Sequence, residues 1–323
     1  MNATGDEKYR VWDSYWQDNR VLTAGPDANP DIAANFDGLW TRAAAALPDG
    51  ARILDLACGN GCVALIAARA FQSAGRSCTI DGIDAADIDP KRYLTKDQEL
   101  LARITFHAKT PMEKLPFEAK TFDAIFSQFG IEFGDLAKSS SEVGRTLKSG
   151  GVIMMLTLAA GTALVQQLDR KARQSRHILA NTKLFDVAVA VAQAIHVFET
   201  KGEGREPRQY LQRFSSEVEA VMKKLDDGDA GSAIAVATTL QNILTERKNI
   251  DLKAQIEAIA TLRARLNEHV VRSEAVVRSA LGDASVTSLT RRLTEAGIRG
   301  IRPEPITIGA HGTVAWRFAG TKD

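Results

Sequence analysis

Two acidic residues and two glycines have the spacing of a ligand-binding site. Asp55 lies in a short apolar run, and Gly59 and Gly61 follow it directly. Asp84 ends a second apolar run, about 20 residues beyond the glycines. Glycines permit the positive φ of a tight turn and let a ligand approach the backbone closely. An acid at such a position can accept hydrogen bonds from both ribose hydroxyls, so a nucleoside-containing ligand is predicted.

A strand, a turn and a helix are needed to position these residues. The run from Ile53 to Leu56 is short and apolar enough for a buried parallel strand, and an Ala-rich helix is expected over 63–71. This order aims free backbone N–H groups at an anionic group of a ligand. The pattern Gly59-x-Gly61-x-x-Ala64 also fits the dinucleotide fingerprint, and a strand-turn-helix without a ligand stays open as well.

Asp55 discriminates between the two ligand classes. Its carboxylate is expected beside the glycine turn, where it would repel a pyrophosphate and attract a cationic ligand. Unit charges about 4 Å apart interact by about 1–4 kcal/mol in wet to partly shielded surroundings. S-adenosylmethionine (SAM) carries a positive ammonium and a positive sulfonium, and its single carboxylate can face the N-terminus of the helix. The residues therefore favour SAM over a dinucleotide.

A resemblance to the class I SAM-dependent methyltransferases is carried first by the segment Asp55-Leu56-Ala57-Cys58-Gly59-Asn60-Gly61. Residues 121–130 resemble the fourth strand of that family, and residues 142–151 resemble the segment before its fifth strand. The resemblance covers residues 35–160 and, more loosely, the C-terminal residues. It implies an α/β fold, namely a Rossmann-like seven-stranded methyltransferase sheet with a large α-helical insertion, and SAM as the cofactor.

The resemblance also implies which residues bind the cofactor. Asp84 is expected on the ribose, and Met112 is expected to offer its backbone N–H and to stack on the adenine. The family usually has Gly-Asp or Ala-Asp in this adenine loop, whereas Thr110-Pro111 stands here, so the loop acid is missing. The complete expected set is Asp55, Ala57, Gly59, Gly61, Asp84, Met112, Gln128, Trp16 and Arg20.

Trp16 and Arg20 belong to an aromatic N-terminal segment that precedes the glycine turn. The family often lays such a segment over the bound cofactor, and Tyr15 is a further candidate for this role. Alternatively, these side chains simply cap the core.

The exit of the fourth strand reads Ser127-Gln128-Phe129-Gly130. It differs from the Asn/Asp-Pro-Pro-aromatic sequence that indicates methylation of an exocyclic nucleobase or glutamine nitrogen. Gln128, Phe129, Ile131 and Glu132 are candidates for the floor of the reaction site, with ordinary packing as the alternative for Phe129 and Ile131. No catalytic residue is assigned, because the sulfonium is a good leaving group and the protein mainly aligns the reactants.

Four segments are expected along the chain. Residues 1–50 form an N-terminal helical segment covering the cofactor site, and residues 51–160 form the SAM-binding Rossmann-like core. Residues 161–283, with repeated helical spacing, form a helical insertion or lid. Residues 284–323 form a final helix and a C-terminal β-hairpin that completes the core.

Composition narrows the function classes. The chain has 323 residues and a formal net charge of +1, which gives no long-range attraction for nucleic acid. Its three cysteines suggest no disulfide framework, and no metal site is expected. No run approaches the ~20 apolar residues of a membrane span, so a cytoplasmic protein without a membrane span is expected, and a homodimer is possible.

The predicted function is methyl transfer from SAM to a small or medium-sized acceptor. One alternative is an NAD-type Rossmann oxidoreductase on the same glycine pattern. The other is a catalytically idle SAM-fold partner subunit that uses the helical insertion as an interaction surface.

Overall fold

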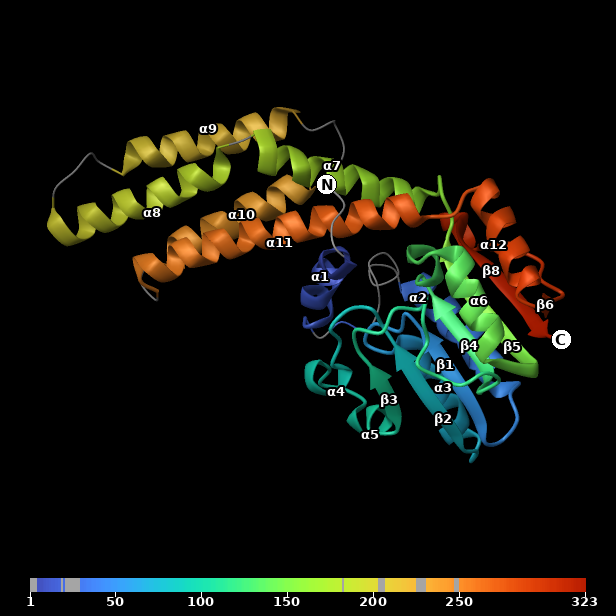
Figure 1. Ribbon diagram of the computed structural model, residues 1–323. Coiled ribbons are helices and arrows are strands. Elements are labelled where there is room, and N and C mark those ends of the chain that lie inside the picture. Colours follow the sequence, from blue (N-terminus) through green and yellow to red (C-terminus); the bar gives the residue numbers. More distant parts are fainter. Residues whose placement is uncertain are drawn as a thin grey trace. The chain divides into compact units, whose positions relative to one another are not determined.

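The computed structural model describes residues 5–18, 20, 30–181, 183–202, 207–224, 231–246 and 250–323. The chain divides into two compact units (Figure 1). The sheet unit comprises residues 1–166 and 275–323, and the helical unit comprises residues 167–274.

The sheet unit contains one mixed sheet with the strand order β3-β2-β1-β4-β5-β8-β6, and β7 pairs with β8 beside this path. β1 to β5 are parallel, and β8 is antiparallel to β5. The strands are β1 (Ala51–Leu56), β2 (Cys78–Ile83), β3 (Ile104–His107), β4 (Phe122–Gln128), β5 (Leu147–Leu158), β6 (Ile298–Arg299), β7 (Glu304–Thr307) and β8 (Thr313–Lys322).

The eight strands fill seven positions of a methyltransferase-type sheet. β6 and β7 both pair antiparallel with β8, the first at Lys322 and the second between Thr313 and Arg317. They therefore form one interrupted strand position at the edge. The predicted fold class, a seven-stranded Rossmann-like sheet with a helical insertion after the fifth strand, is confirmed.

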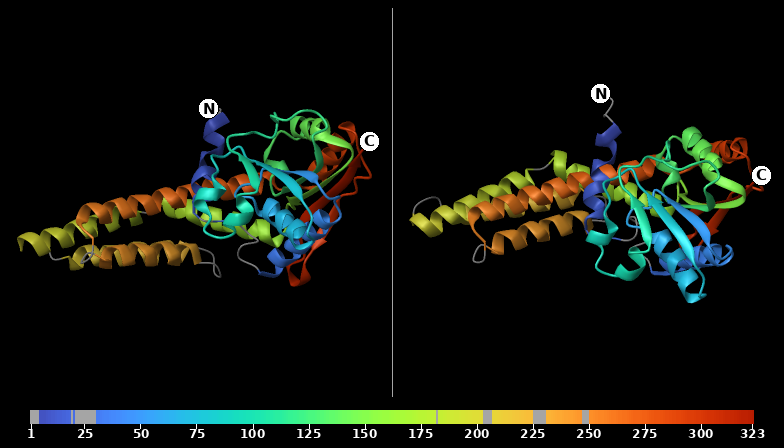
Figure 2. Two further views of the ribbon diagram at one scale, coloured as in Figure 1. Left: turned by 90° about the horizontal axis from the view of Figure 1, so that it is seen from below. Right: turned by 60° about the horizontal axis from the view of Figure 1, so that its bottom comes forward.

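Helices cover both faces of this sheet, α2 and α3 on one side and α6 and α12 on the other (Figure 2). Because both faces are covered, the central strands are mostly apolar, and Leu54, Leu56 and Ile125 are fully buried. The helices of this unit are α1 (Gly5–Trp16), α2 (Pro30–Ala45), α3 (Cys62–Ser73), α4 (Pro90–Tyr93), α5 (Gln98–Leu101), the 3₁₀-helix η2 (Ile131–Phe133), α6 (Leu136–Thr146), α12 (Asp283–Glu295) and the 3₁₀-helix η4 (Gly309–His311).

Residues 142–151, which resemble the segment before the family's fifth strand, divide between a helix and a strand. The helix ends at Thr146, and β5 begins at Leu147 and runs through Gly150 and Gly151. Leu147 pairs with Phe122 ahead of a register shift, so pairing with β4 extends the strand toward the helix.

The helical unit contains most of α7 (Ala163–Asn181) and α11 (Leu252–Ser279), together with α8 (Leu184–Lys201), α9 (Arg208–Lys224) and α10 (Gly231–Thr245). One apolar cluster holds these helices, with Val191, Leu240 and Ile259 at its centre. Among the described residues, no single helix is long and apolar enough to span a membrane. Within this part of the chain, only α7 and α8, taken together as a bent pair, meet the criteria of length and composition.

Candidate functional site

A small cavity opens at the carboxyl ends of the parallel strands. It is reached by residues that follow β1, β2 and β4, as expected for the ligand edge of an open α/β sheet. Its volume is about 60 Å³. The lining residues are Trp12, Trp16, Ala57, Ile83, Asp84, Ala85, Thr110, Met112, Phe129, Gly130 and Phe133.

Asp84 joins the end of β2 to the glycine turn. Its Oδ2 accepts a hydrogen bond from the Gly59 N–H at 2.8 Å, and its Oδ1 accepts one from the Ala86 N–H at 2.8 Å. Burial raises the pKa of Asp84 to about 6, although both N–H donors act in the opposite direction. A carboxylate oxygen has a second acceptor position, so Asp84 can still accept from a ligand in the cavity that it lines.

Asp55 lies in β1 and does not line the cavity. Its side chain is buried, and its Oδ2 accepts from the Ala64 N–H in the first turn of α3 at 3.0 Å. Burial raises the pKa of this carboxyl to about 7, and the charge of Asp84 acts in the same direction. The side chain therefore fixes the start of α3.

The amides of the glycine turn are also engaged within the protein. The Cys58 N–H donates to the Ile83 carbonyl and the Gly61 N–H donates to the Cys58 carbonyl, both at 2.8 Å. The Gly59 N–H donates to Asp84. The turn was expected to present free amides to an anionic group, but these three amides donate to acceptors within the protein. The physical reason is that buried backbone donors require partners. Left-handed φ angles of 57°, 52° and 82° at Ala57, Gly59 and Gly61 produce this tight turn.

The N-terminal segment lies directly on the glycine turn. A Cβ atom on Gly59 would overlap the indole of Trp16, so the ring lies against the glycine backbone. The Asn60 Nδ2 donates to the carbonyls of Trp16 and Arg20, both at 2.7 Å. The Arg20 side chain is exposed, with its guanidinium 4.9 Å from the centroid of the Tyr15 ring. Trp16 thus lines the cavity, whereas Arg20 is tied to the turn through its backbone.

Met112 lies in the cavity wall. Its side chain is buried, and the neighbouring Thr110 N–H donates to the Asp84 carbonyl at 2.8 Å. The loop therefore lies next to the residue expected to bind the ribose.

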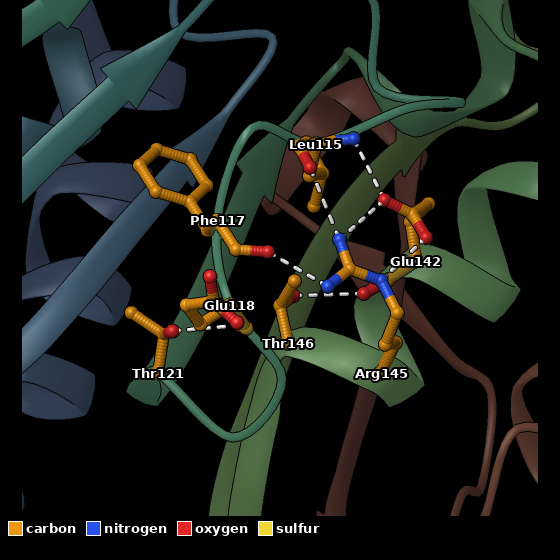
Figure 3. A network of polar contacts seen from close by, with 7 residues as sticks. All are labelled: Leu115, Phe117, Glu118, Thr121, Glu142, Arg145 and Thr146. Atoms are coloured by element: carbon orange, nitrogen blue, oxygen red, sulfur yellow. Dashed lines mark hydrogen bonds and ion pairs between the residues drawn. The ribbon is translucent and has the colours of Figure 1, made fainter.

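A polar network that the sequence reading missed fixes the far end of this loop (Figure 3). Arg145 on α6 donates to the carbonyls of Phe117 at 2.7 Å and Leu115 at 3.0 Å. Glu142 accepts from the Leu115 N–H at 2.7 Å and pairs with Arg145. The Arg145 guanidinium holds the pKa of Glu142 below its ordinary value. The i, i+3 spacing of an acid and an arginine on one helix was the available sequence signal.

Gln128 lies outside the cavity lining. Its Oε1 accepts from the Trp40 indole N–H at 2.5 Å, which orients the amide toward α2. The next residue, Phe129, lines the cavity with a left-handed φ of 53°, and its ring packs edge-to-face on Phe36. At Gly130 a Cβ atom would lie 2.6 Å from the Ala57 Cβ, so the turns after β1 and β4 approach each other closely.

Glu132 is buried in η2 and is also outside the lining. Its Oε1 accepts from the Leu158 N–H at 2.9 Å at the end of β5, and its Oε2 has no protein partner among the described atoms. Burial raises the pKa of this carboxyl to about 7. Ile131 is buried in the core of the sheet unit, so packing accounts for it.

Trp12 and Phe133 are cavity residues that the sequence reading did not select. Trp12 precedes Trp16 by four residues, and Phe133 follows Phe129 by four residues. The rings of Trp12 and Phe133 meet edge-to-face with centroids 5.5 Å apart. The i, i+4 spacing of aromatic residues on α1 was the signal for Trp12.

A family profile described as a methyltransferase domain matches residues 53–151. The ubiquinone/menaquinone biosynthesis C-methyltransferase UbiE of Geobacter sp. (strain M21) is 35% identical over 150 residues, which are 45% of this chain and 58% of that protein. The demethylmenaquinone methyltransferase of Bacteroides fragilis (strain YCH46) is 31% identical over 146 residues, 43% of this chain and 58% of that protein. The chain thus spans a little over half the length of these curated relatives.

Among solved structures, an S-adenosylmethionine-dependent methyltransferase from Mesorhizobium loti is 24% identical, covering 37% of this chain and 52% of that chain with a TM-score of 0.27. The profile match extends from β1 into β5 and contains the glycine turn, Asp84, Met112 and Phe129. Residues 53–151 of this chain therefore match a methyltransferase domain.

Proposed function

We propose that this chain is a SAM-dependent methyltransferase that acts on a small or medium-sized acceptor. The observation that supports this most is the position of Asp84, which lines the cavity while the glycine turn fixes its carboxylate. An acid at the tip of β2 together with a glycine turn after β1 is typical of nucleoside-binding sites in open α/β sheets.

The cavity residues fit SAM in their chemistry. Asp84 would accept hydrogen bonds from the ribose hydroxyls, and Met112 and Ile83 would provide the apolar wall for the adenine. Ala57, Gly59 and Gly61 would form the turn beneath the amino-acid part, which Asp55 supports by fixing α3. When bound, SAM supplies a methyl group already activated by its sulfonium.

The acceptor is proposed to lie beside Phe129 and Phe133. These rings and Trp12 form an apolar wall, which would exclude water and hold a small acceptor in line with the methyl group. Gln128 and Arg20, which lie outside the lining, are proposed to act through the backbone segments that they fix.

A second candidate function, an interaction subunit, is favoured by the surface of the helical unit. The exposed large apolar side chains of the described residues all belong to this unit: Val197, Phe198, Leu211, Ile234 and Val271. Phe198 and Leu211 also line a groove of about 660 Å³ between α8, α9 and α10. We propose that a homodimer would use this face. Light scattering of Phe198→Glu tests this, and an unchanged molar mass relative to a dimeric wild type would contradict it.

Calorimetric titration separates the remaining alternatives. The full chain is expected to bind SAM and S-adenosylhomocysteine but not NAD. Binding of NAD alone would favour the oxidoreductase, and binding of none would favour the idle subunit.

Incubating labelled SAM with an extract from a deletion strain would then identify the methylated product. We also propose that the protein is cytoplasmic and does not bind nucleic acid. A salt-sensitive complex with RNA would contradict the proposal on nucleic acid.

A further inference from the structure

Helix α1 fills the space that the glycine turn leaves open. The indole of Trp16 lies where a side chain on Gly59 would project, and only 5% of Trp16 is exposed. Glycine at this position is the feature that allows a ligand to approach the backbone. The approach is instead made by a side chain of the same protein.

The remaining cavity is too small for a nucleoside cofactor. It holds about 60 Å³, whereas ligand pockets of proteins are about 300–1,000 Å³. Trp12 and Trp16 form one wall of it, with their rings stacked at a centroid distance of 6.4 Å. Removing α1 from this wall would enlarge the cavity without moving any strand.

Specific contacts hold α1 in this position. Asn60 donates from its side chain to the backbone carbonyls of Trp16 and Arg20, and Asp13 accepts from the Asp87 N–H at 2.7 Å. Trp12 packs against Phe133.

Two features disfavour this closed arrangement. The Asn60 Oδ1 is buried and has no partner among the residues that the structure describes, which is unfavourable in a closed state. The charge of Asp13 also opposes ionisation of Asp84 and raises its pKa, so an ionised Asp84 disfavours the docked helix.

We infer that α1 competes with the cofactor: Trp16 occupies the glycine turn in the free enzyme, and α1 must leave the turn before SAM can bind. The inference depends on the proposed function and goes beyond it. It is the opposite of a cover, because a covering tryptophan would pack on the bound cofactor and increase its affinity.

The test is titration of the full chain with S-adenosylhomocysteine in three forms: wild type, Trp16→Ala and the matched control Trp316→Ala in β8. If α1 competes, the observed Kd is the intrinsic Kd divided by the open fraction. Trp16→Ala should then lower the Kd by about three- to tenfold and speed association, whereas Trp316→Ala should leave it unchanged. Trypsin cleavage of the wild type after Arg10 provides a measurement without any variant, and S-adenosylhomocysteine should accelerate it.

The outcomes separate the inference from the proposed function. A higher Kd for Trp16→Ala, together with slower cleavage after Arg10 in the presence of ligand, overturns competition and shows a cover, while cofactor binding stands. Absence of binding in both the wild type and Trp16→Ala overturns the proposed function, and the inference with it. Binding by Trp16→Ala alone supports both.

Discussion

The sheet unit and the helical unit bury different kinds of side chain. In the described part of the chain, the sheet unit buries three carboxyl side chains, Asp55, Asp81 and Glu132. The buried polar side chains of the helical unit are uncharged: Ser175, Gln255 and Ser273. Burying a charge is unfavourable unless it is paired. Asp81 is paired with Arg52 at 3.0 Å, whereas burial raises the pKa of Asp55 and of Glu132 to about 7, so stability alone does not explain these two acids.

The two units also differ at their surfaces. The exposed large apolar side chains of the described residues lie in the helical unit, while the aromatic side chains of α1 in the sheet unit pack around the cavity. The difference fits the proposal that the cofactor binds at the edge of the sheet. It also indicates that the helical unit contributes an apolar core and an apolar surface. The predictions below test this division.

The largest expected effect is a loss of stability caused by a substitution in the helical unit. Leu240 is fully buried in its apolar cluster, and Leu240→Ala should lower the free energy of unfolding by about 2–5 kcal/mol. Denaturant unfolding measures this, and Leu240→Met is the control that keeps most of the volume. The Kd for S-adenosylhomocysteine should not change at temperatures where the protein is folded. A tenfold weaker Kd there would contradict the division.

The corresponding substitution in the sheet unit removes the carboxylate of Asp84 from the cavity. Asp84→Ala should weaken binding of S-adenosylhomocysteine by about 10- to 100-fold, because hydrogen bonds to a charged group are worth about 1.5–3 kcal/mol. Calorimetry measures the Kd. Asp87→Asn, an exposed acid in the same loop, is the matched control and should bind normally. Equal affinity of Asp84→Ala and the wild type would remove Asp84 from the site.

The network behind the adenine loop should have a smaller effect on stability. Arg145→Met removes the donor to Leu115 and Phe117 and leaves the Glu142 carboxylate without its ion pair. Unfolding free energy should fall by about 1–3 kcal/mol. Arg291→Met, which breaks an exposed pair with Glu295, should change it by less than about 1 kcal/mol. Similar losses in both variants would show that the network adds nothing specific.

The last prediction concerns the charge of Asp55. Its folded pKa of about 7 exceeds the ordinary value of 3.8, so the folded protein keeps a proton that the unfolded chain loses between these values. Its stabilising contribution is therefore complete below about pH 4 and declines as the pH rises toward 7. Asp55→Asn keeps an acceptor for the Ala64 N–H without a charge.

The melting temperature of Asp55→Asn should accordingly exceed that of the wild type at pH 8 by a few degrees, at about 2–4 °C per kcal/mol. The difference should shrink at pH 5, where the wild-type carboxyl is protonated. A difference independent of pH would indicate that the charge is not buried.

The sequence predicted the parts of the molecule that local patterns control. The apolar run of β1, the glycine turn, α3 and the acid at the end of β2 were identified from spacing, and the structure brings Gly59 and Asp84 into contact. Residues 304–307 and 313–322 form the antiparallel C-terminal pair expected from their alternation.

The parts that failed depend on contacts distant in sequence. The amides of the turn were expected to be free, but Ile83 and Asp84 from the next strand accept two of them. Gln128 was expected in the site, but Trp40 of α2 binds its side chain. No local pattern specifies that Asn60 binds backbone carbonyls more than 40 residues earlier or that Trp16 lies on Gly59.

A crystal structure of the full chain with S-adenosylhomocysteine tests the central claim most directly. The account predicts that the ribose hydroxyls donate to the Asp84 carboxylate, with the adenine beside Met112 and Trp16 displaced from Gly59. A ligand bound in the groove between α8, α9 and α10, or a saturated crystal in which Trp16 still lies on the glycine turn and Asp84 contacts no ligand, would contradict it.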